Sequence, residues 1–326
     1  MAMSEKYRQV HSKAFVVDGH ADTILKLVED HRSLGERGEK GAVDLPRLQE
    51  GGVDLQFFAF WVDKVFKPTG ALKRTLFLFD AFDRELQRNE QKMRLIKSFR
   101  DIEMAGATGK VGALFSIEGG EAIEGDLSLL RVLFKLGFRS MGLTHNDRNQ
   151  LGDGAGEANA GGLTELGFQA IEEMNRLGMV VDLAHLSDKG FYDALEISKR
   201  PLIVSHACCR TIRDDKRNLS DTQIHALAKR DGLVGVAFIS RFLAANPATI
   251  DDVVNHISHI ARLVGVEHIG LGSDFDGTTP LPKGLEDVTR LPGITRLLLE
   301  RGFSDDDVVK ILGGNYLRVL QETLPK

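Results

Sequence analysis

The chain has 326 residues, of which 42% are hydrophobic and 27% are charged, and its net charge is −5 at pH 7. This length and apolar content suit one large α/β domain or two smaller ones with a substantial core. The acidic balance argues against the basic surface that nucleic-acid partners and anionic membranes require.

Two cysteines occur, side by side at Cys208 and Cys209. Neighbouring cysteines rarely pair with each other, so we expect no disulfide framework and a reducing compartment. The first residues, MAMSEKYRQV, lack the apolar run of a signal peptide, and no segment is long enough to cross a bilayer. The sequence therefore predicts a cytoplasmic protein with no membrane partner.

Apolar strand-like runs alternate with amphipathic helix-like segments along the chain. The expected strands cover residues 15–20, 53–61, 111–118, 140–146, 179–185, 201–206, 233–239 and 268–274. The expected helices cover residues 23–30, 71–104, 127–136, 163–177, 220–230, 250–264 and 304–320, with one more beginning after Ser187.

About eight such strand–helix units fit a closed (β/α)8 barrel of the TIM type. Buried parallel strands read as continuous apolar runs, because helices cover both faces of the sheet. An open, doubly wound sheet is the alternative, but it would more naturally carry a glycine-rich phosphate loop where this chain has DGHAD. No repeat or linker divides the chain, so we predict a single barrel domain over residues 1–326, with the Gly-rich segment 152–162 as a loop at its mouth.

Histidines and carboxylates repeatedly end the apolar runs. The carboxyl ends of the strands of a barrel meet at one mouth, so side chains placed there can hold a divalent metal together. The residues in these positions are His20, Glu118, His145, His185, His206 and Asp274.

The first strand ends in an HxD pair, His20 and Asp22. Alternate residues of a strand face the same side, so both side chains can reach one ion. Glu118 offers a third hard ligand, and its two oxygens can bridge a pair of metals. A histidine that is simply hydrogen-bonded within the core is the alternative interpretation of His20.

Two further histidines, His185 and His206, end consecutive strands and so lie side by side around a barrel. Neutral imidazoles suit zinc, although either histidine alone is more often structural. Asp274, in GSDFDG, is a candidate proton shuttle; its alternative role is to cap the following turn, for which Asp276 is better placed. We expect no metal binding by the other histidines, His11, His31, His225, His256, His259 and His268.

Six sequence blocks resemble the membrane (renal) dipeptidase family, the zinc-dependent M19 peptidases of the amidohydrolase superfamily. The blocks DGHADT, IEGGEAI, GLTHND, VVDLAHLSD, VSHACCR and GLGSDFDG occur in the family's order. The closing region, with GGN before the last helix, is also similar, so the resemblance spans roughly residues 15–320. It implies an amidohydrolase-like barrel that forms a metallo-dependent hydrolase domain.

The resemblance implies two zinc ions per chain. His20 and Asp22 would bind one zinc ion, and His185 and His206 would bind the other. Glu118 and a water or hydroxide would bridge the two ions.

The resemblance also implies roles around these metals. His145 would contact the substrate carbonyl or its oxyanion, Asp274 would be the catalytic acid and base, and Arg217 would bind the terminal carboxylate of the substrate. The expected reaction is hydrolysis of dipeptides with a free C-terminal carboxylate, including those with a D-residue at that position. Longer peptides would be excluded, and the family suggests a homodimer.

Other functions remain open at this stage. A metal-dependent hydrolase can act on other small amides, esters or β-lactams, and a phosphotriesterase-like enzyme can use the same barrel but would not need Arg217. A metal-binding protein without catalysis is a third alternative. The chain departs from the family pattern at Cys208 and Cys209 and in the loop 152–162, and we expect these segments to line the substrate side-chain pockets.

Overall fold

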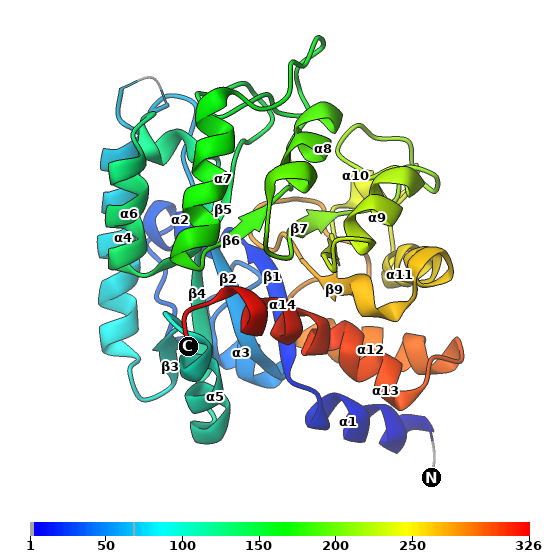
Figure 1. Cartoon of the computed structure of the whole chain (residues 1–326). Coiled ribbons are helices and arrows are strands. Elements are labelled where there is room, and N and C mark those ends of the chain that lie inside the picture. The colour runs from blue at the N-terminus through cyan, green and yellow to red at the C-terminus, as the bar shows by residue number, and fades with distance from the viewer. Residues whose placement is uncertain (1–2, 68) are drawn as a thin grey trace.

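The computed structural model describes residues 3–67 and 69–326, and Figure 1 shows helices arranged around a central set of strands. Eight parallel strands form a ring, because β1 pairs with both β2 and β9, and β2 pairs with β4. The ring confirms the predicted (β/α)8 barrel and excludes the open sheet. In spatial order its strands are β1 (Val16–Ala21), β2 (Val53–Trp61), β4 (Val111–Glu118), β5 (Phe138–Gly142), β6 (Val180–Asp182), β7 (Ile203–Ala207), β8 (Leu233–Val236) and β9 (Ile269–Leu271).

The helices cover the outside of the ring, which explains why every residue of β1 and β4 is buried. Within the described residues, no helix combines the length and the apolar character needed to cross a membrane. The helices are α1 (Met3–Lys13), α2 (Thr23–Glu29), α3 (Leu45–Glu50), α4 (Ala71–Arg88), α5 (Phe99–Thr108), α6 (Leu127–Leu136), α7 (Glu165–Leu177), α8 (Asp188–Ile197), α9 (Asp221–Ala228), α10 (Ser240–Leu243), α11 (Ile250–Val264), α12 (Leu291–Glu300), α13 (Asp305–Val309) and α14 (Asn315–Thr323).

The prediction of one long helix over residues 71–104 is wrong. The segment contains α4, a short strand β3 (Met93–Leu95) and the start of α5, and β3 pairs in parallel with the beginning of β4. Local capping explains the break. The Asn89 side chain donates a hydrogen bond to the Glu85 carbonyl at the end of α4, and the Ser98 hydroxyl accepts one from the Asp101 amide at the start of α5.

The C-terminal helix α14 closes the amino end of the barrel. Its Tyr316 is fully buried and reaches between the strands β1, β8 and β9. These strands carry Gly19, Gly235 and Gly270 at the points of contact, where an added Cβ would lie 1.8 to 2.6 Å from the tyrosine ring or hydroxyl. Because Tyr316 fills the amino end of the barrel, the pocket forms at the carboxyl ends of the strands.

Candidate metal centre and active site

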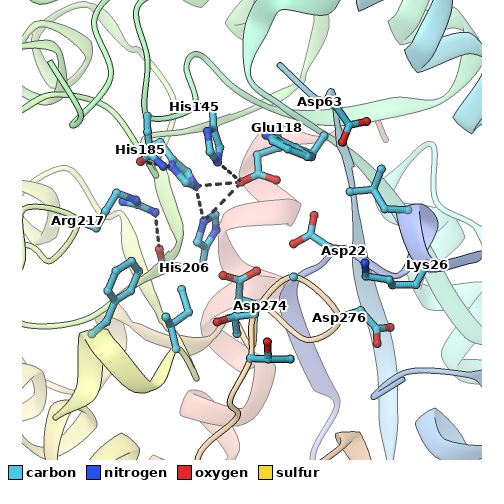
Figure 2. A pocket seen from close by; sticks show the side chains of 18 of the residues that line it. Asp22, Lys26, Asp63, Glu118, His145, His185, His206, Arg217, Asp274 and Asp276 are labelled. Carbon is cyan, nitrogen blue, oxygen red and sulfur yellow. Dashed lines mark hydrogen bonds and ion pairs between the residues drawn. The ribbon is translucent and has the colours of Figure 1, made fainter. Parts of the chain in front are cut away.

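A pocket of about 680 Å³ lies at the carboxyl end of the barrel (Figure 2). Of the eight site residues predicted from the sequence, His20 lies beside the pocket. It is only 2% exposed, and its Nε2 is 3.6 Å from Glu118 Oε2. The structure therefore brings all the predicted site residues together. The other seven line the pocket: Asp22, Glu118, His145, His185, His206, Arg217 and Asp274.

Glu118 lies at the centre of this arrangement, at the end of β4. Its Oε1 is 2.9 Å from His185 Nε2 and 3.8 Å from His206 Nε2, while Oε2 faces His20. Potential ligand atoms meet within 4.8 Å of one another in three groups, and Glu118 belongs to two of them. The groups are His20, Glu118 and His206; Glu118, His145 and His185; and His20, Asp22 and Asp274.

The strand ends place these side chains as the sequence pattern predicts, but not all of them lie on the strands. His20 and His206 belong to β1 and β7, whereas His185 and Asp274 each lie three residues beyond a strand. His185 has φ 68° and Asp274 has φ 60°, a left-handed conformation that is uncommon for residues other than glycine. The chain thus turns sharply at both residues, a feature that often marks functional sites.

Neighbouring side chains orient two of the imidazoles. His185 Nδ1 is hydrogen-bonded to Asn146 Oδ1 at 3.0 Å, and His206 Nδ1 to the Ser205 hydroxyl at 2.8 Å. These contacts use the outer ring nitrogens and aim each Nε2 at Glu118. The two Nε2 atoms lie 2.8 Å apart. Metal-binding histidines are commonly held in this way, by a hydrogen bond to the nitrogen that does not bind the metal.

The donor atoms fit a metal centre. Among the described residues, neither ring nitrogen of the buried His20 has a hydrogen-bond partner, which is costly for a buried polar group. His20 Nε2 instead faces oxygens of Asp22 at 3.7 Å and Glu118 at 3.6 Å. Imidazole nitrogens combined with carboxylate oxygens form the donor set that zinc prefers.

Burial has a large effect on the charge state of two imidazoles and one carboxyl group of the site. It lowers the pKa of His185 and of His206 well below the ordinary value, so both imidazoles are in the neutral form that binds metals. Burial also raises the pKa of the Asp274 carboxyl well above its ordinary value, and the negative charge of Asp22 adds to this effect.

His145 lines the pocket and also belongs to one of the three groups of potential ligand atoms. Its Nε2 is 3.9 Å from Glu118 Oε1, and its ring lies 5.5 Å from the Trp61 ring. Burial, with the nearby charges of Lys67 and Arg217, lowers the pKa of His145 to about 3. The ring is therefore neutral and can donate one hydrogen bond into the pocket.

Arg217 is a buried cation at one side of the pocket, 7% exposed. One terminal nitrogen donates to the His206 carbonyl at 3.4 Å, and Nε has no partner among the described residues. The guanidinium lies 5.6 Å from the centre of the Phe242 ring. Most of its donors therefore remain available to an anion in the pocket.

Sequence reasoning missed several pocket residues. Asn146 directly follows His145 in the GLTHND block, so its position was a usable signal. Arg241 and Phe242 follow the seventh expected strand, the one strand end after residue 111 where no histidine or carboxylate drew attention. Trp61 ends the second expected strand and lines the pocket as well.

The expectation that the cysteines and the loop 152–162 line the substrate pocket is wrong. None of these residues belongs to the pocket lining. Cys208 and Cys209 are free and fully buried, and burial raises the pKa of the Cys209 thiol to about 12. Their thiols donate to the carbonyls of Ala237 and His256, so both cysteines pack in the wall behind the site.

Residues 4–324 match the family described as membrane dipeptidase, peptidase family M19. The chain belongs to this family. The membrane dipeptidase family comprises metallopeptidases, so the chain is a metallo-dipeptidase, a hydrolase with a metal-dependent site.

Relatives of this family resemble the chain over nearly its full length. An uncharacterised dipeptidase of Schizosaccharomyces pombe is 33% identical, over 98% of this chain and 83% of its own length. The solved structure of a metallopeptidase named dipeptidase AC has a TM-score of 0.89 and 29% identity, covering 96% of this chain and 99% of its own. A metallopeptidase of Rhodobacter sphaeroides, solved with a phosphinate mimic of L-Ala-D-Ala, has a TM-score of 0.88 and 28% identity, covering 95% and 99%.

Proposed function

We propose that this chain is a two-zinc dipeptidase that cleaves dipeptides with a free C-terminal carboxylate. The observation that carries the proposal is the shared position of Glu118 in two ligand groups, in a pocket whose side holds the unpaired cation Arg217. The first feature suits a pair of metals, and the second suits a terminal carboxylate. Membership of the dipeptidase family supports both assignments.

The residues that would hold the metals divide into two sets. His20 and Asp22 would bind one zinc ion, His185 and His206 would bind the other, and Glu118 would bridge them. When bound, zinc supplies Lewis acidity, which polarises the peptide carbonyl and makes water a stronger acid.

The remaining residues position the substrate. Arg217 would hold the terminal carboxylate through two parallel hydrogen bonds, a geometry that its planar guanidinium allows. Neutral His145 would donate a hydrogen bond to the carbonyl oxygen, where negative charge develops during the reaction. Phe242 packs against Arg217 and keeps its guanidinium at this side of the pocket.

Asp274 would carry the proton. Its Oδ1 lies 4.0 Å from His20 Nε2, so the carboxyl reaches the metal ligands, and it lines the open pocket. From there it would accept a proton from the attacking water and donate it to the departing amine. The sharp turn at Asp274 aims the carboxyl into the pocket rather than along the strand.

We also propose that a D-residue is accepted at the C-terminal position. The related Rhodobacter sphaeroides metallopeptidase was solved with a phosphinate mimic of L-Ala-D-Ala, which supports this extension. An assay with matched L,L and L,D dipeptides tests it directly.

Dipeptides, the matching tripeptides and the matching C-terminal amides form the central test, with the zinc-loaded protein. We expect hydrolysis of the dipeptides, and rates at least about 100-fold lower for the tripeptides and amides, because both lack a carboxylate where Arg217 would bind it. Comparable rates for tripeptides would contradict the dipeptidase proposal. Faster hydrolysis of N-acyl amino acids or β-lactams would favour an amidohydrolase with another substrate class.

Three further expectations from the sequence remain proposals. We propose that residues 1–326 form one domain, that the chain acts in the cytoplasm, and that it forms a homodimer. The two free, buried cysteines are compatible with a reducing compartment. Light scattering of the purified protein tests the homodimer, since a monomeric mass at micromolar concentration would contradict it.

A further inference from the structure

A second arginine lines the same pocket as Arg217, and both arginines lie near the ring of Phe242. Arg241, in the short helix α10, lines the pocket and is exposed at its rim. Its guanidinium carbon lies 4.7 Å from the centre of the Phe242 ring, and that of Arg217 lies 5.6 Å from the same ring. Both guanidinium groups therefore lie near the same aromatic ring.

Neither arginine forms a direct ion pair among the described residues, although the carboxylates of Glu118 and Asp274 act on Arg217 at longer range. Within the part of the chain that the structure describes, no carboxylate oxygen lies within 4.0 Å of the Arg241 or Arg217 guanidinium. In contrast, charged residues on the opposite side of the pocket do have ion-pair partners. The Lys26 ammonium lies 3.0 Å from Glu29, and Asp63 accepts a hydrogen bond from Arg74 at 3.2 Å.

The charges of the pocket are therefore divided between its two sides. Figure 2 shows Arg217 on one side, and Asp63, Lys26 and Asp276 on the opposite side. The unpaired positive charges gather at the Arg217 side, whereas carboxylates dominate the rest of the lining. A substrate that matches this division carries two negative charges at one end and none at the other.

We propose that Arg241 selects dipeptides whose C-terminal residue has a carboxylate side chain, aspartate or glutamate. This inference rests on the proposed function, in which Arg217 holds the main-chain carboxylate. Arg241 and Arg217 both lie near the Phe242 ring, and we therefore assign the partner of Arg241 to the same substrate residue. A planar guanidinium suits a carboxylate partner, and the neutral amide of asparagine or glutamine offers it no charge.

The experiment compares Ala-Asp with Ala-Asn, which has nearly the same shape but no side-chain charge, each with an L- or D-residue at the C-terminus. We expect the wild-type enzyme to favour Ala-Asp about tenfold in kcat/KM, the effect of one charge-assisted hydrogen bond at a partly exposed position. Arg241→Gln should bring the ratio to about one, and Arg241→Lys should keep part of the preference. Added salt should lower the wild-type ratio, because exposed charges are screened.

Arg296→Gln is the matched control. Arg296 lies on α12, outside the pocket lining, and pairs with Glu300, so its loss changes the net charge equally without changing the pocket. The Asp-to-Asn ratio should stay at its wild-type value in this variant.

The outcomes separate this inference from the proposed function. Hydrolysis of Ala-Asn at least as fast as Ala-Asp in the wild type, or a preference that survives Arg241→Gln, overturns the role of Arg241 and leaves the dipeptidase intact. Failure of the zinc-loaded enzyme to cleave any dipeptide overturns both.

Discussion

Two carboxylates of the site, Glu118 and Asp274, have different surroundings, and these support the different roles that we propose for them. Glu118 faces the imidazole nitrogens of His20, His185 and His206, which is the environment of a bridging ligand. Asp274 instead faces the carboxylate of Asp22, and burial together with this negative charge raises its pKa well above the ordinary value. Burial also raises the pKa of Glu118, but the charge of His20 opposes that effect. A carboxyl group that favours its protonated form is suited to carry a proton.

Asp274→Asn tests this assignment, because the amide keeps the shape of the side chain but cannot exchange a proton. We expect kcat to fall by about 100- to 10,000-fold while zinc stays bound, as measured by steady-state kinetics and by metal analysis of the purified variant. His20→Ala is the comparison, since it should lose both metal and activity. An unimpaired Asp274→Asn enzyme would exclude the proton-carrying role, and loss of zinc would make Asp274 a ligand.

At the scale of elements, the sequence predicts the strand ends well and the loops poorly. The apolar runs of β1, β4 and β7 and their terminal His20, Glu118 and His206 follow from local pattern. The amphipathic period over 71–104 continues through residues that form β3, so periodicity alone could not reveal the interruption. Contacts between distant loops leave no such local pattern.

The loop 152–162 illustrates this limit. It does not line the pocket, yet it ties two site-bearing loops together, because Ala155 N donates to the His185 carbonyl at 2.7 Å and Gly156 N to the Asn146 carbonyl at 2.8 Å. An added Cβ at Gly154 would lie 2.1 Å from the His145 carbonyl oxygen. The glycines therefore permit a close approach that fixes the imidazoles from behind.

The side chain of Asn146 also holds an imidazole in place, and Asn146→Ala tests this contact because it removes the oxygen that is hydrogen-bonded to His185 Nδ1. We expect zinc to bind about 10- to 100-fold more weakly, the usual effect of losing such a partner, as measured by competition with a chromogenic chelator. Asn146→Asp keeps an acceptor at the same position and should restore most of the affinity. Equal zinc affinity in the alanine variant and the wild type would show that Asn146 does not position the ligand.

At the scale of the whole molecule, the barrel brings together site residues from opposite ends of the chain. His20 and Asp274 are 254 residues apart in sequence, yet they lie 4.0 Å apart because β1 pairs with β9. The rule that parallel strands end at one rim predicts this meeting from the sequence. The rule cannot predict how Tyr316 of α14 fills the amino end of the barrel, since this packing depends on glycines from three strands.

Metal removal should therefore destabilise the whole barrel. The ligand set exists only in the folded chain, so zinc at about 1,000 times its Kd adds about 4 kcal/mol to the free energy of unfolding. Scanning calorimetry should record a lower Tm after chelation and recovery when zinc returns. His20→Ala should lack most of this zinc-dependent rise. A Tm that chelation leaves unchanged would contradict a metal site formed by the fold.

The N-terminal helix α1, which the sequence pattern did not indicate, is tied to the barrel by His11. Its ring is buried, with Nδ1 2.7 Å from the Thr295 hydroxyl and Nε2 2.9 Å from the Gly51 carbonyl. This arrangement suits a neutral imidazole that accepts at Nδ1 and donates at Nε2. Burial accordingly lowers the pKa of His11 below its ordinary value of 6.5.

This shift makes the stability of the protein depend on pH. The unfolded chain binds a proton at His11 more readily than the folded chain does. The contribution of neutral His11 to the free energy of unfolding is therefore complete above about pH 6.5 and is lost as the pH falls below that value. We expect the wild type to lose more stability than His11→Gln between pH 7 and pH 5, as measured by urea unfolding of both zinc-free proteins. The metal-site histidines are common to both proteins, so the difference isolates His11. Parallel losses in the two proteins would show that α1 is held by its apolar contacts rather than by this imidazole.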